Sequence, residues 1–187
     1  LIGLVGSEMC IRDSPNLSQY KIVLGSNSPR RRELLAGLDI DFEVQTIPDI
    51  DESFPKTLRS DEVPVYIARK KAEAYISSMS ADELLITADT IVWTFSEILG
   101  KPKDREDAIA MLRKLSGHVH EVITGVCITT KEKTVSFSAS STVCFARLDD
   151  DEIVYYVDKY RPFDKAGSYG ICLLYTSPSP RDRSVSR

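Results

Sequence analysis

The residues best suited to chemistry lie in one short stretch, Lys21–Leu35. Within it, the apolar run Ile22–Leu24 is typical of a buried strand, and the polar residues that follow indicate a turn. Pro29 suits the first position of a helix, with Ser28 before it as the N-cap. The stretch therefore predicts a strand, a turn and a helix in immediate succession.

Three consecutive arginines, Arg30, Arg31 and Arg32, occupy the first turn of this predicted helix. The helix dipole is already positive there, so each cation costs about 0.3–1 kcal/mol. A local rule broken three times in a row favours a functional site. Backbone N–H groups, guanidinium groups and hydroxyls such as that of Ser26 are what a phosphate group needs, so the stretch predicts a phosphate site. The alternative is that the arginines extend into solvent or pair with acidic residues elsewhere.

Four further polar residues are candidates for the surroundings of this loop, namely Glu52, Lys71, Asp89 and Lys101. Asp89 is the strongest because it follows the apolar run Leu84–Ala88, and the ends of such strands carry ligand groups in open α/β sheets. Its carboxylate is suited to holding a divalent cation or to acting as a general base towards water. The alternative for Asp89 is a polar residue at a turn between two strands.

The other candidates have plain structural alternatives. Glu52 lies in an acidic turn, and such turns are usually solvated. Lys71 lies at the edge of an apolar helix face, where its stem can snorkel, whereas Lys101 is held more rigidly between a glycine and a proline. His118 and His120 alternate in a predicted strand and supply two ligands at best, so we interpret them as structural or surface residues rather than a metal site.

The two ends of the chain match each other at the level of DNA. Back-translation of Leu4–Ser14 gives a sequence whose opposite strand, read in a shifted frame, encodes Cys172–Arg181. These ends resemble a transposon adapter used in preparing sequencing libraries. We therefore expect residues 1–14 and 172–187 to be non-native flanks around a single domain, 15–171, whose native C-terminal end continues further.

Composition narrows the class of protein. The 187 residues carry 24 basic and 28 acidic side chains, a net charge of −4, and 20 basic and 25 acidic side chains remain without the flanks. This argues against a nucleic-acid binder, which has a basic footprint. Cys127 and Cys144 lie in strand-like runs without the spacing of a disulfide or metal site, so we expect buried free thiols. Free thiols are typical of a reducing cytoplasm. The sequence shows no secretory signal and no apolar run near the length of a membrane span.

Predicted strands and helices alternate along the rest of the chain. The expected strands are Asp41–Ile47, Leu84–Trp93 with an interruption at Asp89–Thr90, and two neighbouring antiparallel strands within 118–130 and 134–148. The expected helices begin near Ser60, at Asp104 and within Asp149–Glu152. This alternation predicts an α/β fold with a mixed sheet.

Six short motifs occur in the order found in the Maf family, and the resemblance covers essentially all of residues 15–171. They are Ser26–Leu35, Arg69–Ala72, Thr87–Thr90, Gly100–Asp104, Leu115–Gly117 and Asp164–Ile171. The resemblance implies a strongly twisted mixed sheet with helices on its faces, as in inosine triphosphate pyrophosphatases. It also implies hydrolysis of nucleoside triphosphates to the monophosphate and pyrophosphate.

The first and third of these motifs resemble the branch of the family that acts on dTTP and UTP. By this resemblance Asp89 is the catalytic acceptor of the water proton, and Glu52 and Asp89 are the metal partners of Mg²⁺ or Mn²⁺. The substrate-binding residues that it implies are Ser26, Arg30, Arg31, Lys71, Thr90 and Lys101. It further implies a cytoplasmic setting and a homodimer.

One departure from the family concerns the choice of base. The glutamine that helps to select the base in the dTTP/UTP branch falls at Cys172, inside the predicted flank, so the sequence leaves base specificity open. A hypothesis of a different class also stays open. The name of the family comes from inhibition of septum formation, so the chain is alternatively a nucleotide-binding regulator of cell division that acts through a protein partner.

Overall fold

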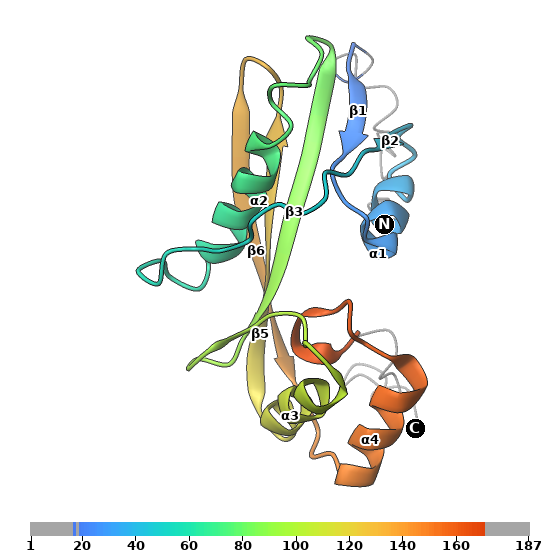
Figure 1. The fold of residues 1–187 in the computed structure, drawn as a ribbon, viewed down its shortest axis with the longest axis vertical. Helices are drawn as coiled ribbons and strands as arrows, with labels where there is room; N and C mark the ends of the chain where they lie inside the picture. The colour runs from blue at the N-terminus through green and yellow to red at the C-terminus, as the bar shows by residue number, and fades with distance from the viewer. Residues whose placement is uncertain (1–16, 18, 171–187) are drawn as a thin grey trace, which may run out of the picture. The chain divides into compact units, whose positions relative to one another are not determined.

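The computed structural model describes residue 17 and residues 19–170 (Figure 1). The two predicted flanks, 1–14 and 172–187, lie outside the described residues, and so does the position of the base-selecting glutamine. The predicted domain boundaries therefore stay predictions.

Strands and helices alternate through the described residues, much as predicted. The strands are β1 (Lys21–Leu24), β2 (Glu43–Val44), β3 (Glu83–Trp93), β4 (Ile98–Leu99), β5 (Val119–Thr129) and β6 (Thr134–Cys144). The α-helices are α1 (Pro29–Ala36), α2 (Val63–Glu73), α3 (Arg105–Leu115) and α4 (Asp150–Tyr160), and a short 3-10 helix, η2, covers Ala166–Ser168. None of these helices is both long and apolar enough to cross a lipid bilayer.

The sheet is mixed, which confirms the predicted α/β class. Its strand order is β2-β1-β3-β5-β6, and β4 pairs with β3 outside this path. Strand β1 runs parallel to both β2 and β3, whereas β4 is antiparallel to β3. The pairing of β1 with β3 ends where Leu24 lies opposite Ile86, so the turn after β1 lies beside the continuing strand β3.

The chain forms two compact units, and the first consists of the residues up to Asp89 together with Thr124–Ala139. Its core joins α2 to the central strands through Val23, Ala68, Ala72, Tyr75, Met79, Leu85 and Cys127. Buried Tyr75 also holds the segment after β2, because its hydroxyl accepts a hydrogen bond from the Ile47 N–H at 3.0 Å and donates one to the Gln45 carbonyl at 3.1 Å.

The second unit consists of Thr90–Ile123 and the residues from Ser140 onwards. Its core is formed largely by α3 and α4, whose buried residues include Ala108, Leu112, Leu115, Ile153, Tyr156 and Val157. Both helices begin at predicted caps. The Asp104 side chain accepts a hydrogen bond from the Asp107 N–H at 2.8 Å, and Asp149 forms a capping box with Glu152. The acidic run at the start of α4 therefore serves the helix.

Three sequence predictions about these elements were wrong. The expected strand Asp41–Ile47 is only the two residues of β2. Beyond β2, the Tyr75 hydroxyl bonds to the Gln45 carbonyl and the Ile47 N–H, so these two groups do not extend the ladder. Strand β3 continues through Asp89 and Thr90 without an interruption. Cys144 is exposed, unlike buried Cys127, because it ends β6 at the edge of the sheet.

Candidate functional site

The turn after β1 is held tightly against β3. The Gly25 N–H donates to the Ile86 carbonyl at 2.9 Å, and a Cβ atom added at Gly25 would lie 2.9 Å from the Thr87 methyl carbon. Ser26, the next residue, is buried, and its Oγ accepts hydrogen bonds from the Ser28 N–H at 3.3 Å and from Arg31 at 3.2 Å. The predicted strand, turn and helix are therefore present, although the Ser28 side chain makes no cap hydrogen bond at the start of α1.

The three arginines of α1 have different environments. Arg31 is half-buried, and its Nη1 donates to the Ala88 carbonyl of β3 at 2.7 Å as well as to Ser26. Arg32 is exposed and donates to the Asn27 carbonyl at 3.1 Å. Arg30 is also exposed. Of the three arginines, Arg31 is therefore the one that bonds to the strand that carries Asp89. Arg30 and Arg32 are exposed, as the alternative of arginines that extend into solvent predicts.

Asp89 lies within β3 and is almost fully buried. Its Oδ1 accepts from the Lys71 Nζ at 2.7 Å, and the same nitrogen lies 2.9 Å from the Glu52 Oε1. Lys71 comes from the last turn of α2 and keeps only 13% of its side chain exposed, whereas Glu52 keeps 49%. The structure thus brings two predicted carboxylates to one ammonium group, and it explains why β3 tolerates a charged residue.

Burial is the main influence on Asp89, and it raises the pKa of this carboxyl above the ordinary value for aspartate. Lys71 and, more weakly, Arg31 act in the opposite direction, while Glu52 adds to the rise. Burial likewise lowers the pKa of Arg31, and the charges of Asp89 and Glu52 oppose that change. The raised pKa makes this carboxylate a stronger base than an ordinary aspartate.

Comparison with protein-family models identifies the family of this sequence. The family model described as "Maf-like protein" matches residues 21–176. The chain belongs to the Maf-like protein family. A dTTP/UTP pyrophosphatase of Parabacteroides distasonis is 69% identical over 156 residues, which are 83% of this chain and 81% of that relative. A dTTP/UTP pyrophosphatase of Bacteroides fragilis is 62% identical over the same shares of the two chains.

The solved structures similar to this Maf-like chain are more distant. One is the Ham1 protein of Staphylococcus aureus, which is 19% identical, with 66% of this chain and 71% of that chain covered and a TM-score of 0.46.

The donor set beside Lys71 fits a hard divalent cation. Because Glu52 and Asp89 both contact one nitrogen atom, their carboxylate oxygens are no further apart than the two ion-pair distances together. Mg²⁺ is commonly held by one or two carboxylates, with phosphate oxygens and water completing its shell. The described residues of this Maf-like chain hold no cluster of three or more metal-ligating histidine, cysteine, aspartate or glutamate side chains.

Two predicted site residues belong to the second unit. Thr90 follows Asp89 in β3, and Lys101 follows β4 as an exposed side chain between Gly100 and buried Pro102. Their grouping with Ser26, Arg31, Glu52, Lys71 and Asp89 therefore stays a prediction. His118 and His120 belong to no group of three or more metal-ligating side chains among the described residues. His118 is exposed and its Nδ1 donates to the Ser116 carbonyl at 2.7 Å, while His120 is buried against Tyr169.

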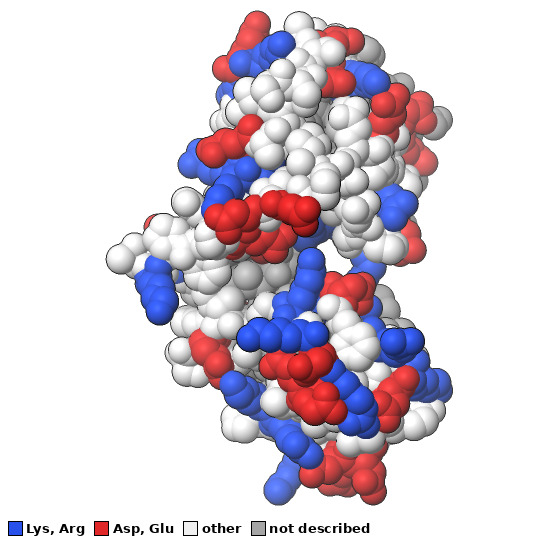
Figure 2. All heavy atoms as spheres, in the orientation of Figure 1, with Lys and Arg blue, Asp and Glu red and all other residues white. Residues whose placement is uncertain are grey.

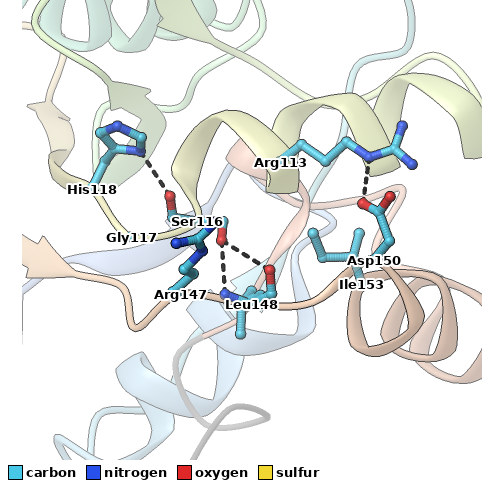
Figure 3. Close-up of a pocket in the computed structure, with 8 residues that line it drawn as sticks. All are labelled: Arg113, Ser116, Gly117, His118, Arg147, Leu148, Asp150 and Ile153. Atoms are coloured by element: carbon cyan, nitrogen blue, oxygen red, sulfur yellow. Dashed lines mark hydrogen bonds and ion pairs between the residues drawn. The ribbon is translucent and has the colours of Figure 1, made fainter.

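The second unit contains a pocket of about 430 Å³ (Figure 3). Its lining includes Arg113, Ser116, His118, Arg147 and Asp150, and it includes no site residue predicted from the sequence. The Arg113 Nε donates to Asp150 at 2.8 Å, and the Ser116 hydroxyl joins the backbone of Leu148. These contacts join the end of α3 to the start of α4. We therefore assign the candidate site to the Asp89 cluster rather than to this pocket.

Proposed function

We propose that this chain hydrolyses nucleoside triphosphates, with dTTP and UTP preferred, to the nucleoside monophosphate and pyrophosphate. The observation that carries the proposal is the position of Asp89, a buried carboxylate paired with Lys71 next to a turn that Arg31 fastens to the same strand. The names of the relatives support the choice of substrates.

The candidate site residues of the first unit can be assigned roles in this hydrolysis. A water oxygen forms a bond to the α-phosphorus while the bond from that phosphorus to the bridging oxygen breaks, and pyrophosphate leaves. Asp89 accepts the proton that the water loses, and its raised pKa makes it a better proton acceptor than an ordinary aspartate. Arg31 and Lys71 offset the negative charge of the polyphosphate, and the buried Ser26 hydroxyl orients Arg31.

Glu52 and Asp89 are the residues that would hold Mg²⁺ or Mn²⁺, which when bound would neutralise charge on the phosphate oxygens. Lys71 contacts both carboxylates and favours the ionised form of Asp89. We include Arg30, Thr90 and Lys101 as further substrate-binding residues because they occupy motif positions of the family. A homodimer and a cytoplasmic setting are part of the same proposal.

The test is pyrophosphate release from dTTP, UTP, CTP, GTP and ITP with Mn²⁺, using the full 187-residue chain and its Asp89→Asn variant. We expect release from dTTP and UTP and a loss of at least about 100-fold in the variant, the range for losing a general base. Asp41→Asn is the matched control, because Asp41 is an exposed carboxylate. Circular dichroism would confirm that each variant is folded.

The outcomes separate the parts of the proposal. Release confined to dTTP and UTP supports both reaction and specificity, and equal release from other nucleotides contradicts the specificity. Full activity of Asp89→Asn removes the proposed base. Nucleotide binding by a folded chain without any release favours the regulator that acts through a protein partner.

A further inference from the structure

The loop that carries Glu52 has little packing to fix its position. Residues 51–57 are all exposed, and Ile50, just before them, is only partly buried against the core of the first unit. In Figure 1 the connection from β2 to α2 passes β3 before it turns back into the helix. Polar contacts must therefore decide where the Glu52 carboxylate lies.

Two consecutive lysines of α2 supply these contacts, and they bind different parts of the loop. Lys71 contacts Glu52 itself, whereas the Lys70 Nζ contacts the residues on either side of it. The Lys70 ammonium donates to the Asp51 Oδ2 at 2.6 Å, to the Ser53 carbonyl at 3.2 Å and to the Ser53 Oγ at 3.3 Å. All three donor positions of the ammonium group are thus engaged.

The loop also closes on itself. The Ser53 N–H donates to the Asp51 Oδ1 at 2.9 Å, and the Ser53 hydroxyl donates to the Asp51 Oδ2 at 2.7 Å. Asp51, Ser53 and Lys70 therefore form one hydrogen-bonded ring around the base of Glu52. The ring uses no atom of the Glu52 carboxylate.

The separate contacts of Lys70 and Lys71 matter because Lys71 is shared between two carboxylates. Its ammonium contacts both Glu52 and Asp89, so a cation that engages either carboxylate, or a phosphate group that engages the ammonium, competes with those contacts. The contacts of Lys70 are unaffected by such competition. Lys70 can therefore keep Glu52 near Asp89 while Lys71 changes partners.

We propose that Lys70, acting through Asp51 and Ser53, is a positioning residue that holds Glu52 for divalent-cation binding beside Asp89. This inference rests on the proposed function, in which Glu52 and Asp89 hold the metal ion. Groups that orient metal ligands typically contribute 10–100-fold to metal affinity or activity. Since the Asp51 side chain is 67% exposed, we expect an effect near the lower end of that range.

The test compares the full chain with Lys70→Met, Lys70→Arg and Arg69→Met. Arg69 is the matched control because it is the preceding cation of α2, is exposed, and its side chain forms no hydrogen bond or ion pair with the described residues. Mn²⁺ binding is followed by the loss of the free-ion electron paramagnetic resonance signal, and dTTP turnover is measured over a range of Mn²⁺ concentrations. We expect Lys70→Met to weaken Mn²⁺ binding about tenfold, while kcat at saturating Mn²⁺ stays within about twofold. Lys70→Arg should restore most of the affinity, and Arg69→Met should match the wild type.

A second measurement needs neither metal nor nucleotide. Amide hydrogen exchange of residues 48–58 should be faster in Lys70→Met than in Arg69→Met, above all at Ser53, whose N–H is held by Asp51. Equal Mn²⁺ affinity and equal exchange in these two variants would overturn the inference. A wild-type chain that binds Mn²⁺ but hydrolyses no nucleotide would instead refute the proposed function, and the affinity and exchange comparisons would still decide the role of Lys70.

Discussion

At the scale of single residues, Asp89 is an unfavourable group, since a carboxylate in a strand interior loses most of its hydration. Lys71 is its closest cation, and it opposes the rise that burial causes in the pKa of Asp89. Lys71→Met should therefore raise this pKa further. Because a general base must be ionised, activity should then be lost at a higher pH than in the wild type as the pH is lowered.

The measurement is the pH profile of kcat/KM for dTTP. Lys21→Met is the control, because Lys21 forms an exposed ion pair with Glu43 in the same unit and its loss should leave the profile unchanged. If the acidic limbs of Lys71→Met and the wild type superimpose, Lys71 does not set the ionisation of Asp89.

The residues of this cluster were predictable to different degrees. Asp89 stands out in the sequence because it follows an apolar run, where open α/β sheets place ligand groups. Arg31 stands out only as one of three consecutive cations at a helix start. The role of Lys70 was not predictable from the helical wheel, which says only that this side chain leaves the apolar face. A signal was present in the two doublets, Asp51-Glu52 and Lys70-Lys71, but their pairing depends on a loop path that periodicity does not encode.

At the scale of secondary-structure elements, the position of α2 depends on one glycine of β5. A Cβ atom added at Gly125 would lie 2.3 Å from the backbone carbon of Pro64 and 2.3 Å from the Val65 nitrogen. Real Cβ atoms do not approach backbone so closely, so Gly125→Ala must push α2 away from the sheet. We expect a loss of at least about 2 kcal/mol in the free energy of unfolding, measured with urea.

Gly37→Ala is the control for this prediction. Gly37 lies at the end of α1 with φ −65°, and its added Cβ would make ordinary contacts at 3.5 Å. This variant should be neutral or slightly more stable, because alanine restricts the unfolded chain. Equal stability of the two variants would show that α2 does not rest on Gly125. Since α2 also carries Lys70, which holds the loop of Glu52, Gly125→Ala should also weaken Mn²⁺ binding.

The elements that could be predicted are those with local signals. Helix α3 is capped by Asp104 and is followed by Gly117 with φ +71°, so the signals for both of its ends come from residues next to the helix. The short length of β2 and the continuity of β3 depend instead on distant partners. Tyr75 replaces part of the β2 ladder, and Lys71 offsets the charge of Asp89 within β3. Sequence patterns contain neither contact.

At the scale of the whole molecule, acidic and basic side chains lie beside one another over the visible face (Figure 2). Between pH 5.5 and 7.5 the side chains with ordinary pKa values in range are the two histidines. They differ sharply. His118 is exposed, whereas His120 is fully buried, with its Nε2 2.6 Å from the Tyr169 hydroxyl and its ring edge-on to Phe145.

Burial lowers the pKa of His120 below the ordinary value of 6.5. Below about pH 6.5 the unfolded chain therefore binds a proton that the folded chain resists, so stability falls as the pH drops through 6.5 towards the lower folded pKa. The slope due to His120 cannot exceed about 1.4 kcal/mol per pH unit, the value for one proton. His120→Gln keeps a hydrogen-bonding partner for Tyr169 and should remove this slope from urea unfolding curves, whereas His118→Gln should retain it. If wild type and His120→Gln lose stability in parallel on acidification, the buried histidine is not the group that limits the acid stability of the second unit.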